Sequence, residues 1–382
     1  MRSAVDIARD LGSHAPSPCY VLDMRRLAEN LARIARVQEE AGVKVLLALK
    51  GFALPAAFPA IRKVAPGCAA SSLWEAKLAH EFFGGEIHVY APAYRPDEVG
   101  ELAAIVDHVV FNTPAQLARF RDAFARQSLG LRVNPGISEV SAEIYNPCRR
   151  GSRLGSIPEL LEGADLEGLE GLHAHGLCEN LHDSSIRLVD ALEARFARWL
   201  VDAKWVNLGG GHLMTHADYD LDAWIARLRE FRKRWDVEVY LEPGGAFVWE
   251  AGVLVASVLD IVGTDDVPAA ILDVSATAHM PDVLEMPYRP EIVGAGEPGE
   301  KPYTYRLGGP TCLAGDEIGA YSFDAPLRPG DRLVFADMAH YTIVKTTMFN
   351  GVRHPDIALL HEDGTLEVVR RFRYEDFRSR FV

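Results

Sequence analysis

Short apolar runs alternate with longer amphipathic segments along the first two thirds of the chain. Short runs are typical of buried strands, and apolar residues that recur every three or four positions are typical of helices. The expected strands cover residues 44–49, 68–71, 87–91, 108–112, 129–134, 168–175, 205–208 and 237–242. The expected helices cover residues 24–41, 54–64, 72–83, 96–104, 114–125, 157–163, 184–200 and 221–234. This alternation predicts an α/β fold, a (β/α)8 TIM-type barrel.

A doubly wound open sheet is the competing interpretation of the same pattern. The barrel is favoured by the number of strands and by the polar residues that fall at the strand ends.

The pattern changes after Pro243. Residues 251–263, 267–276, 301–309, 331–339 and 365–374 are typical of strands joined by turns, without long helices between them. The sequence therefore predicts a second, β-rich C-terminal domain. The expected limits are 18–245 for the barrel and 246–382 for the second domain, with residues 1–17 as a candidate addition to the second domain.

Composition narrows the classes of function. The chain has 382 residues, 48% of them hydrophobic, and a formal net charge of −14. Such a charge argues against a nucleic-acid partner or an anionic membrane surface, and it suits a cationic small molecule. No stretch reaches the roughly 20 apolar residues that a membrane-spanning helix needs.

Cysteine usage and the N-terminus bear on the cellular compartment. The five cysteines include no C-x-x-C pair, which argues against a zinc ribbon or a disulfide framework. The first residues lack the apolar core of a signal peptide. We therefore expect a cytoplasmic protein without a bound metal.

The first expected strand ends in "VKVLLALKGF", where Lys50 follows an apolar run and Gly51 follows the lysine. A strand-end lysine often extends its amine to water. The alternative is a Schiff-base lysine, whose pKa burial lowers so that the amine attacks a carbonyl. Position alone does not separate the two.

Later strand ends carry complementary groups. Gly209, Gly210 and Gly211 follow the seventh strand, and glycines there allow backbone amides to approach a phosphate. Glu242 ends the eighth strand and is either a rim ion-pair partner or the partner of a pyridinium nitrogen. His175, at the end of the sixth strand, is either structural or lies against a flat ring. With Lys50, these residues supply what pyridoxal 5'-phosphate requires.

The same segments resemble the pyridoxal-phosphate-dependent decarboxylases of the alanine-racemase-like fold. "PCYVLD" is similar to that family's first strand, "LALKGF" to its Schiff-base lysine segment, and "LHAHGLCEN" to the segment with the ring-stacking histidine. "LGGGH" is similar to the phosphate loop, and "LEPG" to the pyridinium glutamate. The resemblance covers nearly the whole chain.

Two C-terminal segments extend the resemblance. "GPTCLAGDEIG" carries the family's cysteine and acidic pair, which implies that Cys312 and Asp316 reach into the partner's site of a homodimer. "MAHYTIVKTTMFNG" places Tyr341 where the family has a phosphate-binding tyrosine. Cys312 is also the implied proton donor, although a buried thiol is an equal alternative.

Within this family the chain is most similar to the carboxynorspermidine decarboxylases, which also take carboxyspermidine. The distinguishing stretches are "YNPCRRGSRLG" and "ATAHMPDVLEMPYRPEIVGAG". The likeness implies that Asp282, His279 and Glu285 contact the polyamine end of the substrate, which agrees with the attraction between carboxylates and protonated amines. Without the likeness, this stretch would read as a domain-linking loop. Gly245 stands where the subfamily usually has an acidic residue, which changes the expected preference for polyamine length.

The resemblance implies decarboxylation in polyamine biosynthesis, with Lys50 carrying the cofactor and Glu242 assisting electron withdrawal. The alternatives are a decarboxylase of meso-diaminopimelate or ornithine, an amino-acid racemase, and a non-catalytic pyridoxal-phosphate-binding protein. A racemase would need a second base opposite Lys50. A non-catalytic protein would tolerate the loss of Cys312 and Asp316, and both residues are present.

Overall fold

The computed structural model describes residues 1–12, 14–140, 143–264 and 266–382. These residues form two compact units, one of Met1–Glu29 with Val248–Val382 and one of Asn30–Phe247. The units are described separately below.

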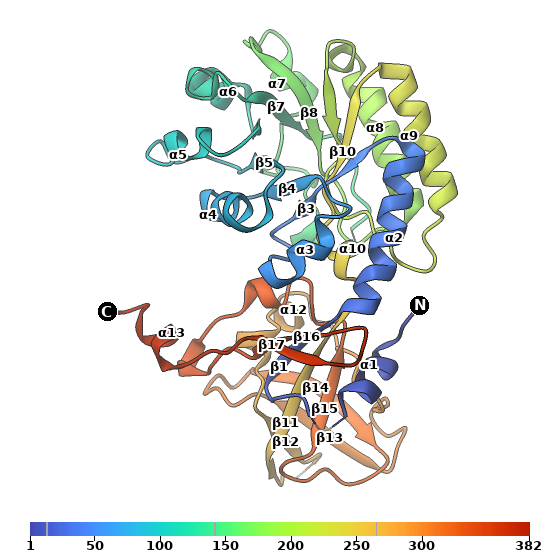
Figure 1. Cartoon of the computed structure of the whole chain (residues 1–382), viewed down its shortest axis with the longest axis vertical. Helices are drawn as coiled ribbons and strands as arrows, with labels where there is room; N and C mark the ends of the chain where they lie inside the picture. Colours follow the sequence, from blue (N-terminus) through green and yellow to red (C-terminus); the bar gives the residue numbers. More distant parts are fainter. Residues whose placement is uncertain (13, 141–142, 265) are drawn as a thin grey trace. The chain divides into compact units, whose positions relative to one another are not determined.

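The unit Asn30–Phe247 contains a parallel sheet in the order β2-β10-β9-β8-β7-β6-β5-β4-β3 (Figure 1). Its strands are β2 (Lys44–Val45), β3 (Leu47–Ala48), β4 (Gly67–Ala70), β5 (Glu86–Tyr90), β6 (His108–Phe111), β7 (Ser128–Val133), β8 (Leu169–Ala174), β9 (Trp205–Asn207) and β10 (Glu238–Leu241).

The sheet closes through a single extended stretch. β2 pairs with β10, and β3 pairs with β4. Only Leu46 separates β2 from β3, and its N–H donates to Leu241 O at 2.8 Å. The predicted (β/α)8 barrel is therefore confirmed, and the open doubly wound sheet is wrong because that sheet would leave two unpaired edges.

The helices of this unit alternate with its strands, and α8 and α9 lie side by side (Figure 1). They are α2 (Met24–Ala41, which begins in the other unit), α3 (Phe58–Ile61), α4 (Leu73–Leu78), α5 (Val99–Ala103), α6 (Pro114–Phe120), α7 (Pro158–Leu161), α8 (His182–Leu200), α9 (Leu221–Trp235) and α10 (Gly245–Val248), which crosses the unit boundary.

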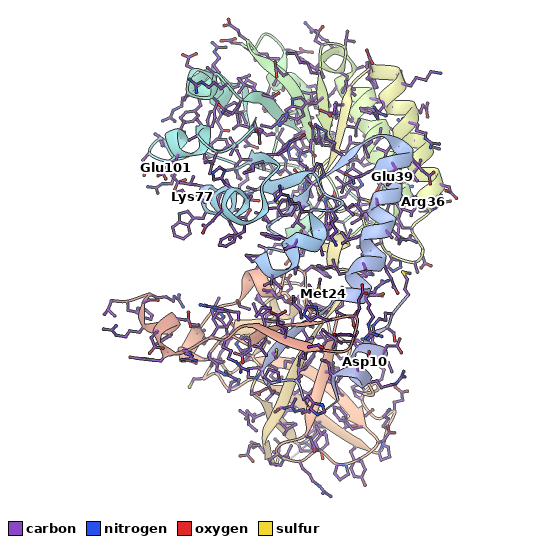
Figure 2. The ribbon with its side chains drawn as sticks, in the orientation of Figure 1. Asp10, Met24, Arg36, Glu39, Lys77 and Glu101 are labelled. Atoms are coloured by element: carbon purple, nitrogen blue, oxygen red, sulfur yellow. The ribbon has the colours of Figure 1, made fainter. Side chains whose placement is uncertain are left out.

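Several barrel helices are shorter than the sequence predicts. The helix expected over 54–64 becomes a 3-10 turn, Pro55–Ala57, followed by α3, in which Pro59 lacks an amide donor. The helix expected over 72–83 ends as a π-helical turn, Ala79–Phe83, before Gly84 at φ +72°. On the exterior, an ion pair joins Lys77 and Glu101, which Figure 2 labels on α4 and α5.

The other unit is a mixed sheet in the order β14-β13-β12-β11-β1-β16-β17, with β15 paired to β11. Its strands are β1 (Cys19–Asp23), β11 (Gly252–Val262), β12 (Ala269–Leu272), β13 (Tyr303–Gly308), β14 (Glu317–Phe323), β15 (Arg332–Ala336), β16 (Asp356–Leu360) and β17 (Leu366–Arg370). Its helices are α1 (Ala4–Leu11), α11 (Ala276–His279), α12 (Asp282–Glu285) and α13 (Tyr374–Arg378).

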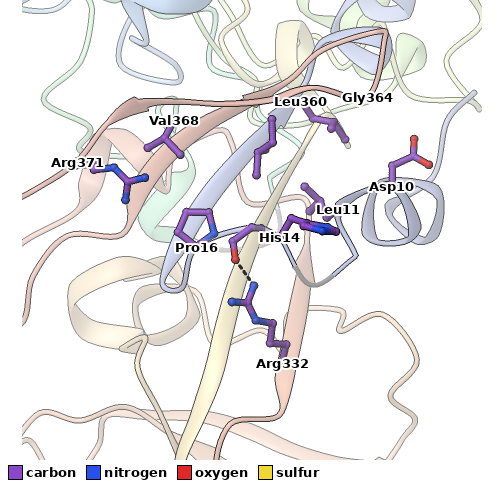
Figure 3. Close-up of a pocket in the computed structure, with 11 residues that line it drawn as sticks. Asp10, Leu11, His14, Pro16, Arg332, Leu360, Gly364, Val368 and Arg371 are labelled. Atoms are coloured by element: carbon purple, nitrogen blue, oxygen red, sulfur yellow. Dashed lines mark hydrogen bonds between the residues drawn. The ribbon is translucent and has the colours of Figure 1, made fainter.

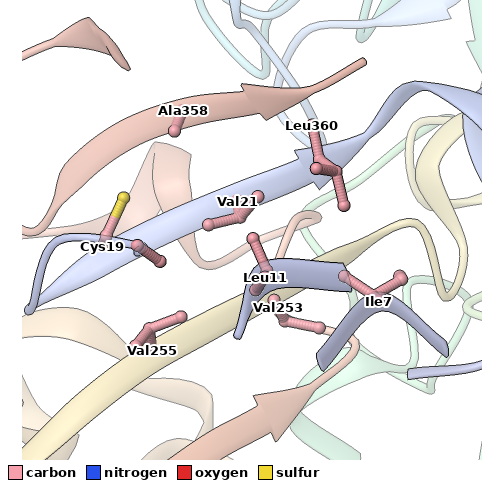
Figure 4. Close-up of a cluster of buried hydrophobic side chains, with 9 residues drawn as sticks. Ile7, Leu11, Cys19, Val21, Val253, Val255, Ala358 and Leu360 are labelled. Carbon is pink, nitrogen blue, oxygen red and sulfur yellow. The ribbon is translucent and has the colours of Figure 1, made fainter. Parts of the chain in front are cut away.

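A buried cluster holds α1 against this sheet (Figure 4). Ile7 and Leu11 lie on the inner face of α1, and Ser3 caps its N-terminus by accepting from Asp6 N–H. Ile7 and Leu11 pack with Val21 of β1 and Val253 of β11, and all four side chains are nearly inaccessible to solvent. An amphipathic N-terminal helix thus completes the core of the unit.

The compact units differ from the expected domain limits at residues 18–29 and 246–247. β1 pairs antiparallel with β11 and parallel with β16, so its backbone hydrogen bonds place it in the mixed sheet. Two strands, β14 and β16, were not foreseen. Gly319 interrupts the apolar pattern of the segment that forms β14, and β16 is a short run beginning at buried Asp356. The domain limits themselves stay a prediction.

A search of the described residues finds no helix that combines the length and the apolar character needed to cross a membrane.

Candidate active site

Polar groups meet at the carboxyl ends of the barrel strands. Lys50 follows β3, His175 directly follows β8, the glycines 209–211 follow β9, and Glu242 directly follows β10. Parallel strands of a barrel share one end, so the loops after them surround one site. The structure therefore brings together the cofactor residues that the sequence predicted in the barrel.

Gly51 permits two strand-end loops to meet. A Cβ on Gly51 would lie 2.8 Å from Gly244 Cα, and Gly51 N–H donates to Ala48 O at 3.1 Å. The glycine after Lys50 is thus explained by a close backbone contact with the loop after β10.

Glu242 is the most constrained group of the site. Its Oε1 accepts from His173 Nε2 at 2.9 Å, and its Oε2 accepts from Asn207 Nδ2 at 3.0 Å. Burial favours the neutral acid, but His173, His175 and Lys50 outweigh burial and hold the pKa of Glu242 well below its usual range. A buried carboxylate is therefore kept ionised at neutral pH.

His175 is a neutral imidazole beside this carboxylate. Burial lowers its pKa well below the ordinary value, and the nearby Lys50 adds to that effect. Its Nδ1 lies 3.4 Å from Glu242 Oε1 and 3.2 Å from Gly210 N, and these two contacts orient the ring. A neutral, oriented ring suits the predicted role of packing against an aromatic cofactor.

The three glycines are required by close packing. A Cβ on Gly210 would lie 2.5 Å from Glu242 O, one on Gly209 2.7 Å from His175 Cα, and one on Gly211 2.4 Å from Leu177 C. Gly209 and Gly211 also have positive φ angles, +74° and +83°. The loop lies against the other site residues only because it carries no side chains.

Lys50 faces an environment that disfavours its charge. Burial lowers the pKa of its ammonium group, Arg132 adds to the effect, and Glu242 opposes it. A neutral amine is the nucleophilic form of lysine, so the site favours covalent attachment to a carbonyl.

Four groups of the site received no role from the sequence, although His173 stands out there as a polar residue at a strand end. His173 and Asn207 hold Glu242, and the buried Arg132 donates to His175 O at 3.1 Å while its guanidinium lies over the Tyr90 ring. Arg132 and Asn207 are polar residues within apolar strands, and that interruption was the available signal.

The remaining predicted residues belong to the mixed-sheet unit. Cys312 is exposed, and its N–H donates to Asn350 Oδ1 at 2.8 Å. Tyr341 is partly buried and has a positive φ of +53°. Asp282 and Glu285 lie on α12, and both contact Lys345.

Asp316 and His279 are buried within that unit. Asp316 Oδ1 accepts from Ser275 Oγ at 2.9 Å, and its Oδ2 accepts from Thr311 Oγ1 at 2.6 Å. His279 Nδ1 accepts from Ser275 N–H at 3.2 Å. Their expected substrate roles stay predictions, and their burial weighs against direct contact.

Pyridoxal phosphate fits the strand-end residues. The site offers an amine with a lowered pKa in Lys50, an ionised buried carboxylate in Glu242 and a neutral ring in His175. His173, His175 and Glu242 also have donor atoms within 4.8 Å of one another, as have Glu86, His88 and His108 at the opposite strand ends. Such donor sets suit a metal as well. Because the amine of Lys50 belongs to the same site as His173, His175 and Glu242, that donor set favours pyridoxal phosphate over a metal.

Replacing Gly210 by alanine is expected to raise the dissociation constant of pyridoxal phosphate about tenfold or more, because the new Cβ displaces Glu242 or His175. Spectroscopic titration of the cofactor-free protein measures the constant. Gly100→Ala is the matched control, since nothing lies within 4 Å of its Cβ. Equal affinity in the two variants would contradict this account of the loop.

His212, the residue after the glycines, makes folding sensitive to acid. Burial lowers its pKa from 6.5 to about 4. The unfolded chain therefore binds more protons between those values, and stability falls as the pH decreases through this window. The expected loss from this residue between about pH 8 and about pH 5 is about 2 kcal/mol.

Denaturant unfolding at the two pH values measures this loss. In His212→Asn the difference between them should shrink by about 2 kcal/mol. His80→Asn is the control, because His80 is exposed. An unchanged pH dependence in His212→Asn would show that this imidazole does not titrate as expected.

Comparison with known proteins identifies the family. Residues 19–339 match the description "Pyridoxal-dependent decarboxylase, C-terminal sheet domain". The chain is 48% identical to the carboxyaminopropylagmatine decarboxylase of Synechocystis sp., over 96% of each chain. It is 44% identical to the carboxynorspermidine/carboxyspermidine decarboxylase of Campylobacter jejuni, over 95% of this chain and 98% of the relative.

A solved structure agrees with these relatives. The carboxynorspermidine decarboxylase of Campylobacter jejuni, complexed with norspermidine, is 43% identical, with a TM-score of 0.89 over 96% of this chain and 100% of that chain. The chain is therefore a member of the pyridoxal-dependent decarboxylases, enzymes that use pyridoxal phosphate to remove a carboxylate.

Proposed function

We propose that this enzyme decarboxylates carboxynorspermidine and carboxyspermidine, forming norspermidine and spermidine in polyamine biosynthesis. The observation that carries the proposal is near-full-length similarity to the Campylobacter jejuni decarboxylase whose name states both substrates. The carboxylates of Asp282 and Glu285, already in contact with an ammonium group, support a substrate with protonated amines.

Carboxyaminopropylagmatine is a second candidate substrate, favoured by the 48% identical relative from Synechocystis sp.. Its agmatine part ends in a guanidinium group, whereas the two polyamine precursors end in an ammonium group. Gly245, at the start of α10, contributes no carboxylate to either type of cation. The distal cation is thus the chemical feature that separates the candidates.

The roles of the residues follow from their environments. The cofactor, when bound, supplies an electron sink for the bond to the departing carboxylate. Lys50 would hold the cofactor through Nζ, and Glu242 would keep a proton on its ring nitrogen. His175 would pack against the ring, while the glycine loop and Tyr341 would hold the phosphate. Cys312 would return a proton to the carbon that loses the carboxylate.

Carbon dioxide release by the cofactor-loaded enzyme tests the proposal. Carboxynorspermidine, carboxyspermidine, carboxyaminopropylagmatine and meso-diaminopimelate are offered separately, and kcat/KM is compared. Highest kcat/KM with either polyamine precursor supports the first candidate, and highest kcat/KM with the agmatine derivative supports the second. Release from diaminopimelate alone, or from none of the four, would overturn both.

We further propose a cytoplasmic homodimer with shared active sites. The exposed Cys312 supports a site completed by a partner, and five cysteines without a disulfide support a reducing compartment. Mixing Lys50→Ala and Cys312→Ala subunits tests the sharing. Random exchange should give about a quarter of wild-type activity, because half of the dimers then carry one intact site. Cell fractionation tests the compartment.

A further inference from the structure

The two acidic residues of α12 already hold a cation from their own chain. Lys345 Nζ contacts Asp282 Oδ1 and lies 2.5 Å from Glu285 Oε2. The side chains of Lys345, Asp282 and Glu285 are 28%, 20% and 48% exposed. The three charged groups therefore form a partly open cluster that a solvent-borne cation can reach.

The backbone fixes the lysine in this position. Lys345 ends the 3-10 turn Ile343–Lys345, and its N–H donates to Thr342 O at 3.0 Å. Two residues later, Thr347 N–H donates to Ala278 O at 2.8 Å and ties this segment to α11. Backbone hydrogen bonds thus hold the segment that carries Lys345 next to α11, the helix that precedes α12.

Lys345 carries the same charged group as the distal end of the proposed substrates, which is an aminobutyl group in carboxyspermidine and an aminopropyl group in carboxynorspermidine. Its side chain is an ammonium group on four methylenes, which is the chemistry of an aminobutyl group. It also cancels half of the charge that Asp282 and Glu285 supply, so the cluster carries a net charge of −1 instead of −2. Burial lowers the pKa of Lys345, but the two carboxylates outweigh burial and raise it, which keeps this charge in place.

We propose that Lys345 is a specificity-determining residue that occupies the subsite for the substrate's distal ammonium group and competes with it. This inference rests on the proposed function, because it assumes that Asp282 and Glu285 receive the substrate's distal cation. Lys345 then lowers the affinity of the enzyme for the polyamine end of the substrate. The two carboxylates could pair with two cations, and Lys345 leaves room for only one from the substrate.

Replacing Lys345 by methionine keeps the length of the side chain and removes its charge. The dissociation constant of norspermidine should fall about fivefold, the scale of a partly exposed ion pair. KM for carboxynorspermidine should fall by a similar factor, while kcat stays equal or decreases as product leaves more slowly. Lys345→Gln is a second neutral variant, and Lys345→Arg, which keeps the charge, should retain wild-type affinity.

The test uses the cofactor-loaded enzyme, with calorimetric titration of norspermidine and steady-state kinetics near pH 8. Lys301→Met is the matched control elsewhere in the same unit, because Lys301 is paired with Asp324 at 2.7 Å. A second control is L-2,4-diaminobutyrate, which has the same amino-acid head, ends in a γ-ammonium group and lacks the distal aminopropyl cation. Its kcat/KM should change less than about twofold in Lys345→Met.

The outcomes separate the inference from the proposed function. If the wild-type enzyme releases carbon dioxide from no polyamine precursor, the proposed function fails, whatever the variants do. If it does release carbon dioxide, tighter norspermidine binding in both neutral variants supports competition by Lys345. Unchanged or weaker binding in these variants would overturn the inference, since Lys345 would then be neutral or would position the carboxylates for the substrate.

Discussion

Alanine in place of Lys50 is expected to lower kcat by about ten-thousandfold, the largest effect of any single change considered for this enzyme. Lys50 stands at the barrel mouth with a lowered pKa, which supports its proposed role as the amine that attaches the cofactor. Loss of that amine removes the proposed covalent anchor of the cofactor and, with the anchor, most of the turnover. Steady-state turnover and the visible absorption of the bound cofactor measure the two effects.

Lys44→Ala is the matched control for this change. Lys44 begins the same extended stretch at its other end, where it pairs with Glu86 at 2.6 Å and with Glu238 at 2.8 Å. That variant should lose some stability and keep most of its turnover. Near-normal turnover in Lys50→Ala, with the cofactor bound, would rule out the assigned role of Lys50.

Glutamine in place of Glu242 is expected to lower kcat by roughly a hundredfold to a thousandfold, while the cofactor still binds. The amide retains the size of the carboxylate and one acceptor oxygen for His173 or Asn207. It lacks the negative charge that is proposed to keep a proton on the cofactor's ring nitrogen. The effect should therefore appear in kcat at saturating substrate, with cofactor content measured spectroscopically.

Glu238→Gln provides the comparison on the same strand. Glu238 is exposed at the amino end of β10, whereas Glu242 lies just beyond its carboxyl end. Removal of the Glu238 charge weakens the contact with Lys44 and should leave kcat within about twofold of the wild-type value. An unchanged kcat in Glu242→Gln would sink the electron-withdrawing role.

The pocket between α1 and β17 lies outside this chemistry. It has a volume of about 570 Å³ and is lined by apolar residues such as Leu11 and Leu360 together with Arg332 and Arg371 (Figure 3). Arg332 donates to Ala15 O, and Arg371 Nη1 lies 3.2 Å from Asp356 Oδ2. Both guanidinium groups thus serve the packing of the unit.

Local sequence was sufficient to predict the barrel and the polar residues at its strand ends. Apolar periodicity reveals strands because a barrel buries both faces of each strand. A residue directly after such a strand, as Glu242 is after β10, must lie at the barrel mouth whatever the rest of the chain does. Lys50 and the glycines 209–211 were predictable for the same reason.

The pairing partners of strands and of site residues could not be predicted from local sequence. β1 is followed directly by α2, as in the barrel's own strand–helix pattern, yet it pairs with β11 and β16, more than two hundred residues away in sequence. His173 and Asn207 lie on separate strands from Glu242, and their contacts with it depend on strand order and register. No local pattern encodes such distant pairings.

The amino-acid sequence alone thus determines the order of elements, the residues at the strand ends and the family likeness, because strand periodicity and motif spacing are local properties. The ionised state of Glu242, the neutral ring of His175 and the pairing of Lys345 with the acidic residues of α12 depend on folding. Each arises when groups remote in sequence are brought within hydrogen-bonding distance. For Glu242 and His175, removal from water also shifts the charge equilibria of the side chains.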